Sequence, residues 1–92
     1  MTNDFAALAH AIVRLRGEIH ELGRSATERL RSTDLDLAEG LEAVFDSTDQ
    51  IAAWLVEPTI GFGERSALEL LANGERDTVR RALHHLQYGL GA

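Results

Sequence analysis

The sequence predicts an all-α protein, a compact bundle of five or six short helices with no sheet. Three observations support this prediction. Apolar residues recur at spacings of three and four in several segments, as they do on one face of a helix. Residues that cap or stop helices, among them the only proline, separate these segments. No segment alternates apolar and polar residues for long enough to form a strand.

The first expected helix covers the segment DFAALAHAIVRLRGEIHEL, residues 4–22. Its large apolar residues form one stripe with the spacing of a heptad seam. They are Phe5, Leu8, Ile12, Leu15, Ile19 and Leu22. We expect this stripe to pack on the domain's own core, and a short homodimer seam is the alternative. Gly17 lies opposite the stripe, where it need not break the helix.

Two further helices are expected before residue 46. Gly23 is a typical helix stop, and Ser25 with Glu28 has the spacing of a capping box that starts a new short helix. One of residues 32–34 then caps another helix. The residues expected on its buried face are Leu37, Ala38, Leu41, Val44 and Phe45.

A helix capped by Ser47 follows, and Pro58 ends it because the residue before a proline is driven out of helical geometry. We expect this helix to bury Ile51, Trp54 and Leu55.

The last two helices begin after the loop TIGFGER. Ser66 and Glu69 form a second capping box, and the Asn-Gly pair at 73–74 is a strong helix end. The final helix is expected over residues 75–88, with Gly89 as its stop. Its expected buried residues are Val79, Leu83 and Leu86, and Leu90 just after it is a further candidate.

Composition excludes several classes of function. With 92 residues the chain is expected to form a small core that a partner would help to stabilise. It contains no cysteine, so disulfides and thiolate chemistry are excluded. Nine arginines against fifteen acidic residues give a net charge of -6, which does not favour strong nucleic-acid binding and suits a basic partner surface. No apolar run is long enough to cross a membrane, so we expect a cytoplasmic protein.

Neither catalysis nor metal binding is expected, and no cofactor is predicted. His84 and His85 are adjacent on a helix and point apart, while His10 and His20 have no third ligand at a matching spacing. Most Ser and Thr residues lie at expected helix starts, where capping explains them. Motifs for phosphate or dinucleotide binding are missing from the sequence.

The segment HELGRSATERLRS suggests an alternative function, a small helix-turn-helix-like DNA-binding transcriptional regulator. In that alternative Arg24, Arg29 and Arg31 contact DNA. Arg29 argues against it, because it occupies a position where such motifs bury an aliphatic residue. A stand-alone helical dimerisation module is a further alternative.

The final helix carries a basic stripe in which Arg76, Arg80 and His84 recur every fourth residue, with Arg81 and His85 beside them. Two explanations stay open. The cations offset the helix dipole near its C-terminus, or they face a partner.

From about Leu37 onward the chain resembles the toxin-binding domain of the Xre/MbcA/ParS antitoxin family. The matching features are an ordered set along residues 37–92: Val44-Phe45, Trp54-Leu55, Pro58, a glycine-containing loop, Leu68, Leu70-Leu71, Gly74, Val79, Leu83 and Tyr88-Gly89. The resemblance divides the chain into an N-terminal helical region, residues 1–36, and the toxin-binding domain, residues 37–92. Where the family usually has a proline after the helix cap, this chain has Ala67, which that position tolerates.

The resemblance implies a type II antitoxin without enzymatic activity. Its partner would be a toxin of the RES fold, which consumes or transfers groups from NAD, and the antitoxin would occlude the toxin's active site. Members often carry an upstream DNA-binding region, which residues 1–36 match poorly.

The resemblance also implies roles for individual residues. Six apolar residues are expected in the core: Trp54, Leu55, Leu68, Leu71, Val79 and Leu83. The toxin contacts are expected at Pro58, Ile60, Gly61, Phe62, Gly63, Arg65, Tyr88 and Gly89. The two glycines of the loop leave Phe62 and Arg65 free to point outward, and for Phe62 the alternative is that it folds back as a lid on the domain's own core.

Overall fold

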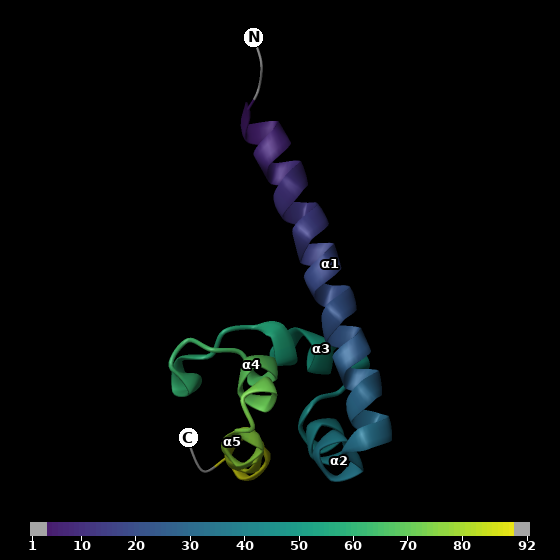
Figure 1. Ribbon diagram of the computed structural model, residues 1–92, viewed down its shortest axis with the longest axis vertical. Helices are drawn as coiled ribbons and strands as arrows, with labels where there is room; N and C mark the ends of the chain where they lie inside the picture. The colour runs from purple at the N-terminus through teal and green to yellow at the C-terminus, as the bar shows by residue number, and fades with distance from the viewer. Residues whose placement is uncertain (1–3, 90–92) are drawn as a thin grey trace.

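A computed structural model describes residues 4–89, and within them five α-helices and one 3-10 turn (Figure 1). The elements are α1 (Asp4–Thr33), α2 (Leu35–Val44), α3 (Thr48–Val56), η1 (Ile60–Phe62), α4 (Ala67–Ala72) and α5 (Arg76–Tyr88). No strand occurs in this part of the chain; a single isolated bridge joins Thr59 and Arg65. The all-α prediction is confirmed.

Helix α1 is one continuous helix of 30 residues, so the expected stop at Gly23 and the separate helix after Ser25 are wrong. Gly23 is buried inside the helix against α3. A Cβ atom at this position would lie 2.5 Å from the carbonyl oxygen of Ala52. Glycine is therefore needed here because two helix backbones approach closely. From the sequence alone, this glycine is interpreted as a helix end.

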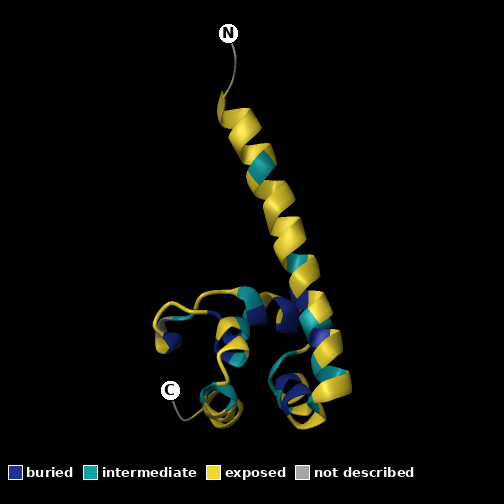
Figure 2. Ribbon diagram, viewed as in Figure 1, coloured by how far each residue is buried: buried dark blue, intermediate teal, exposed yellow. Residues whose placement is uncertain are grey.

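The molecule consists of a projecting arm and a compact body (Figure 1). The arm is residues 4–19 of α1, and the body is formed by the rest of α1 with α2 to α5. Every arm residue is exposed except Ala11, which is half-buried (Figure 2). Contact with the body begins at His20, whose Nε2 lies 3.3 Å from Oδ1 of Asp49.

Five residues of the apolar stripe of α1 lie on this arm and the sixth, Leu22, lies just beyond it and is exposed too, so the expectation that the stripe packs on the domain's own core is wrong. Its six residues are exposed to between 46% for Ile19 and 83% for Phe5. The part of α1 that does pack on the core comes later, through Ala26 and Leu30. Thr27 is buried beside them and donates a hydrogen bond to the carbonyl oxygen of Gly23.

The core of the body collects residues from α2, α3, η1, α4 and α5. It comprises Leu37, Leu41, Ile51, Leu55, Phe62, Ala67, Leu70, Val79 and Leu83, with Trp54 and Leu71 packed against it. Most of the expected core residues are confirmed. Leu68 is only half-buried, and Leu86 is 53% exposed, so their assignment to the core is wrong. Leu90 lies outside the described residues.

The expected helix ends are largely confirmed. Asp34 caps α2 by accepting a hydrogen bond from the backbone N–H of Leu37, and Ser47 caps α3 in the same way. Ser66 and Glu69 form the reciprocal capping box of α4. Helix α3 ends two residues before Pro58. The connections after α4 and α5 both contain glycines with positive φ, Gly74 and Gly89.

Candidate protein-binding site

The loop between α3 and α4, residues 58–65, is a closed turn, and we call it the crossing loop. The backbone N–H of Thr59 donates to the carbonyl oxygen of Arg65 over 3.0 Å. Between these ends the chain makes the 3-10 turn η1, and Gly63 and Glu64 adopt positive φ. The loop therefore has one defined shape and returns the chain towards α4.

Phe62 points into the body, so of the two outcomes left open for it the structure shows the core lid and not the outward contact. It is 5% exposed, and its ring centroid lies 5.9 Å from that of Trp54 in an edge-to-face arrangement. Trp54 also packs against Phe45, at 5.6 Å. The aromatic side chain therefore holds the crossing loop on the core.

Arg65 is not free either, because it joins the crossing loop to the start of α5. Its Nε donates to the carbonyl oxygen of Phe62 over 3.1 Å, and its Nη1 lies 2.8 Å from Oε2 of Glu75. Asn73 donates to the same carboxylate oxygen. These hydrogen bonds, first from Asn73 and then from Arg65, lower the pKa of Glu75 below its usual value.

A groove of about 370 Å³ lies between the crossing loop and α5, and we call it the loop groove. Its lining is mostly apolar, with two basic side chains from α5. The residues are Trp54, Thr59, Gly61, Phe62, Thr78, Arg81, Ala82, His85 and Leu86.

The basic residues of this groove are available to a partner. Arg81 is exposed, donates to the carbonyl oxygen of Asp77 and makes no ion pair among the described residues. His85 lies one turn further along the same face of α5 and is exposed as well. The groove therefore combines exposed apolar surface, including Leu86, with the guanidinium of Arg81 and the imidazole of His85.

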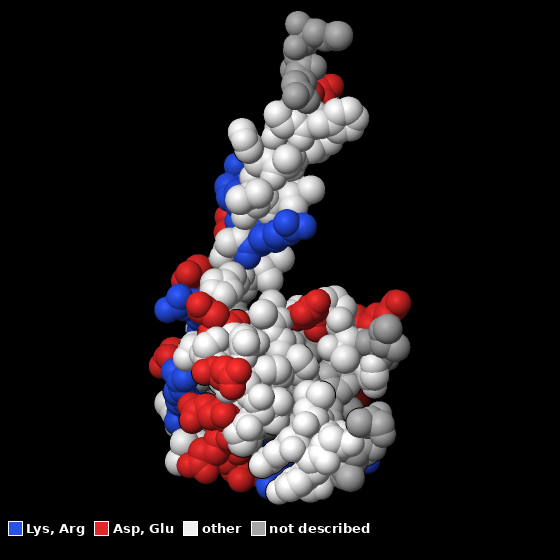
Figure 3. Space-filling model, turned by 180° about the vertical axis from the view of Figure 1, so that it is seen from behind, with Lys and Arg blue, Asp and Glu red and all other residues white. Residues whose placement is uncertain are grey.

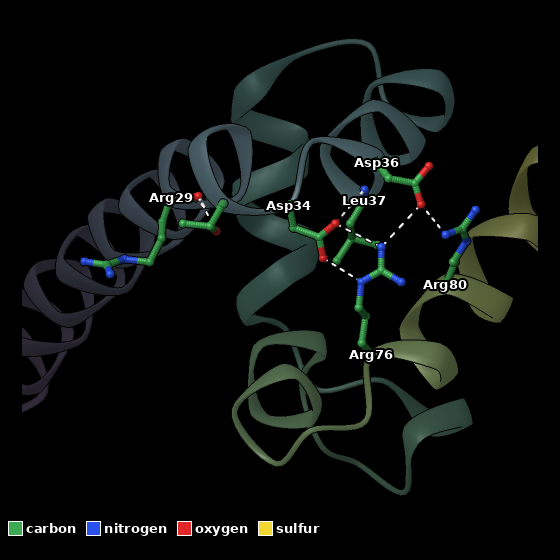
Figure 4. Close-up of polar contacts among 7 residues, drawn as sticks. Arg29, Asp34, Asp36, Leu37, Arg76 and Arg80 are labelled. Carbon is green, nitrogen blue, oxygen red and sulfur yellow. Dashed lines mark hydrogen bonds and ion pairs between the residues drawn. The ribbon is translucent and has the colours of Figure 1, made fainter.

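Two arginines of the basic stripe, Arg76 and Arg80, bind carboxylates of the same chain (Figure 4). The guanidinium of Arg76 binds both carboxylate oxygens of Asp34, at 2.6 and 2.9 Å, and also reaches Asp36 at 3.3 Å. Arg80 pairs with the same oxygen of Asp36. The hydrogen bonds from Arg76 lower the pKa of Asp34, and Asp34 in turn raises the pKa of Arg76. Because Arg76 lies at the start of α5, the dipole explanation does not apply to it.

Tyr88 lies on the other flank of α5. It is 62% exposed, its ring centroid is 4.6 Å from that of His84, and it lines a second groove of about 340 Å³ between α2 and α5. Asp36 and Glu39 line this second groove too, and we call it the tyrosine groove.

The predicted contact residues lie in two separate places, on the crossing loop and at the end of α5. Pro58, Gly61 and Gly63 are exposed on the crossing loop, and Gly89 is exposed beside Tyr88 at the end of α5. The side chain of Ile60 lies outside the described residues. Sequence reasoning missed Leu86 as a surface residue and did not connect Arg81 and His85 with the loop. The spacing of four between these two basic residues was the available signal.

The geometry required for a helix-turn-helix is absent from residues 4–33, because α1 has no turn at Gly23. Arg24 lies 3.7 Å from a carboxylate oxygen of Asp49. Arg31 is bound more firmly, by Glu28 at 2.6 Å and Glu42 at 3.2 Å. DNA contact by these arginines and by Arg29 stays a prediction that a binding assay must test.

Residues 4–89 contain no group of three or more His, Asp or Glu side chains arranged to hold a metal ion. None of the helices in this range is long and apolar enough to cross a membrane.

Comparison with known protein families identifies the family of this chain. The model of the antitoxin Xre/MbcA/ParS C-terminal toxin-binding domain matches residues 40–89, which is more than half of the chain. The matched range contains the second half of α2, all of α3, α4 and α5, and the crossing loop. It also contains the α5 residues of both grooves, and it leaves α1 outside. Comparison with curated proteins and comparison with solved structures each gave no match.

Proposed function

Because the chain belongs to the antitoxins that share the Xre/MbcA/ParS C-terminal toxin-binding domain, we propose that it neutralises a RES-domain toxin by covering the entrance of the toxin's active site. The toxin, which uses NAD, performs the chemistry; the antitoxin performs none and acts in the cytoplasm by binding. The family match over residues 40–89 is the observation that carries this proposal.

The contact surface that we propose has two parts, one on each flank of α5. The first is the loop groove with the exposed backbone of Gly61 and Gly63, and Leu86 is its central apolar residue. Phe62 and Arg65 support this part from within, since Phe62 is buried and Arg65 is bound to Glu75. Pro58 and Ile60 belong to the same loop.

The second part is Tyr88 with Gly89 at the end of α5. The carboxylates of Asp36 and Glu39 line the groove beside Tyr88. Sites that bind the pyrophosphate of NAD present positive potential from backbone N–H groups, helix N-termini or basic side chains. Because Asp36 is paired with Arg76 and Arg80, the exposed ring of Tyr88 and the carboxylate of Glu39 are the features of this groove that suit such an entrance.

Co-expression with the RES-domain toxin encoded by a neighbouring gene tests the proposal. Growth is expected to be restored by the wild-type chain, and purified toxin is expected to elute with it as a complex. A neighbouring gene without a RES-type product, or toxicity unchanged by this chain, would contradict the proposed function.

DNA binding is the alternative function that the same chain allows us to test. The helix-turn-helix reading requires salt-dependent binding to the chain's own promoter that weakens in an Arg24→Ala, Arg29→Ala double variant. The continuous α1 and the net charge of -6 lead us to expect no such binding.

We also propose that the antitoxin acts as an oligomer, in which the stripe of the arm is the pairing surface. In the single chain this stripe contacts nothing that buries it, and its six residues are exposed to 46% or more. A protein of this size gains stability from such association.

A further inference from the structure

The arm presents a continuous apolar surface that the body does not cover. The stripe comprises Phe5, Leu8, Ile12, Leu15, Ile19 and Leu22, all exposed. Figure 3 shows uncharged surface along much of the arm, with arginine side chains at its sides. Exposed apolar surface of this extent marks an interaction site.

We propose that a second copy of this chain covers the stripe and that the two arms form a parallel, two-stranded coiled coil. This pairing rests on the oligomer proposed above, and its orientation is the new element. Phe5, Ile12 and Ile19 occupy the a positions of the heptad, and the d positions hold only leucine. A β-branched residue at a with leucine at d is the pattern that favours two strands in parallel coiled coils.

The residues beside the seam allow the two arms to approach. At the e and g positions the arm has the small residues Ala9 and Ala11 and the charged residues Asp4, Arg16 and Glu18. In a parallel pair Asp4 faces Ala9 of the second copy and Arg16 faces its Ala11, while the position opposite Glu18 is Gly23, which is buried against α3 of its own chain. Like charges therefore do not oppose one another along the seam.

The area available is sufficient for a dimer. With about 150–200 Å² for each fully exposed large apolar residue, the exposed fractions of the stripe give about 1,000–1,400 Å² for two copies. Stable interfaces begin near about 1,200 Å². The seam has a defined end, because the next a and d residues are Ala26, packed on the chain's own core, and Arg29.

Single cysteine variants test the orientation, since the chain has no cysteine of its own. In a parallel pair each stripe residue meets its own copy, so Leu8→Cys is expected to form a disulfide-linked dimer in a glutathione redox buffer. Val13→Cys is the matched control, because Val13 is 64% exposed on the arm but lies at a b position outside the seam. It is expected to stay largely unlinked.

A mixture of Leu8→Cys and Ile19→Cys chains separates the two orientations. In an antiparallel pair with full overlap, residue 8 lies opposite residue 19, and the mixed disulfide would dominate. In a parallel pair each variant links to itself. A dominant mixed product would overturn the parallel orientation, while toxin neutralisation would be unaffected by that result.

Pairing itself is tested by Leu15→Glu, measured by analytical ultracentrifugation across a range of concentrations. Wild type is expected to sediment as a dimer and Leu15→Glu as a monomer, with Val13→Glu remaining dimeric. Both substitutions lie on the arm, outside the core of the body, so unchanged near-UV circular dichroism is expected to show that the body stays folded. A monomeric wild type at high concentration would overturn the proposal.

Discussion

Gly23 allows the crossing of α1 and α3 to be tested directly, because the arm contains a matched control. Gly17 lies in the same helix, is exposed, and a Cβ atom there would meet no atom within 4 Å. At Gly23 the same Cβ would lie 2.5 Å from the carbonyl oxygen of Ala52 and 3.0 Å from its carbonyl carbon. The two substitutions to alanine therefore change the helix in the same way and differ in what the new methyl group meets.

The expected magnitudes follow from this difference. Replacing glycine by alanine inside a helix stabilises it by about 1 kcal/mol, and this gain applies to both positions. Overpacking at a tight contact costs about 1–3 kcal/mol, and it applies only to Gly23→Ala. The obstructing atoms at Ala52 belong to the backbone of α3 and cannot swing aside. We therefore expect Gly17→Ala to gain about 1 kcal/mol and Gly23→Ala to be less stable than Gly17→Ala by about 2 kcal/mol or more.

The assay is urea unfolding followed by far-UV circular dichroism, with all variants at one protein concentration because association contributes to stability. For a domain of this size, about 1 kcal/mol shifts Tm by about 4–8 °C. If Gly23→Ala is stabilised as much as Gly17→Ala, the close crossing of α1 and α3 is refuted.

Three further measurements probe the body. Asp34→Asn retains a good N-cap but loses the charge that pairs with Arg76. The pKa of Asp34 is lowered on folding, so its charge stabilises the folded protein fully above the ordinary carboxyl pKa of about 4. This stabilisation is lost as the pH falls through the lowered pKa. The urea midpoint of Asp34→Asn is therefore expected to be lower at neutral pH and to fall less on acidification than that of wild type, and parallel pH profiles would contradict this. Phe62→Ala empties a buried site beside Trp54 and is expected to cost about 3–5 kcal/mol, with a change in tryptophan fluorescence; an unchanged Tm would show that Phe62 does not hold the crossing loop. Leu86→Asp is expected to weaken toxin binding by about tenfold or more in calorimetric titration without lowering Tm. The control Arg14→Glu, on the arm, is expected to bind the toxin as wild type does. If Leu86→Asp binds as tightly as wild type, the loop groove is not part of the contact surface.

Local sequence signals were sufficient to predict most of the body. The caps at Asp34, Ser47 and Ser66 and the stop at Pro58 depend on residues within four positions of one another, so their geometry follows from short stretches of sequence. The apolar spacing of α2, α3 and α5 likewise identified most of the buried faces.

The errors arose where a residue's role depends on a distant part of the chain. Gly23 is equally consistent with a helix end and with a close helix crossing, and only the position of Ala52, far along the sequence, distinguishes them. For Phe62 the sequence left two outcomes open, outward contact or a lid on the core, and only the position of Trp54 decides between them. The apolar stripe is what a core helix and a dimer seam both require, so periodicity alone could not decide which surface would cover it.

For the predicted contacts, the sequence named segments of the chain but could not give their arrangement in space. Gly61 and Tyr88 were grouped as one surface, yet they lie on different flanks of α5 because helix phase separates Tyr88 from His85 and Leu86. Arg76 was assigned to the surface stripe, and its partner Asp34 is 42 residues away in the chain.

The uninterrupted α1 also fixes a phase between the arm and the body. Each residue of an α-helix turns the chain by about 100°, and no hinge in residues 4–33 absorbs a change in that rotation. A single residue inserted near Gly17 would leave both the stripe and the body intact, but it would turn one against the other by more than a quarter of a circle. A change in the length of this segment therefore changes the direction in which the body faces relative to the stripe.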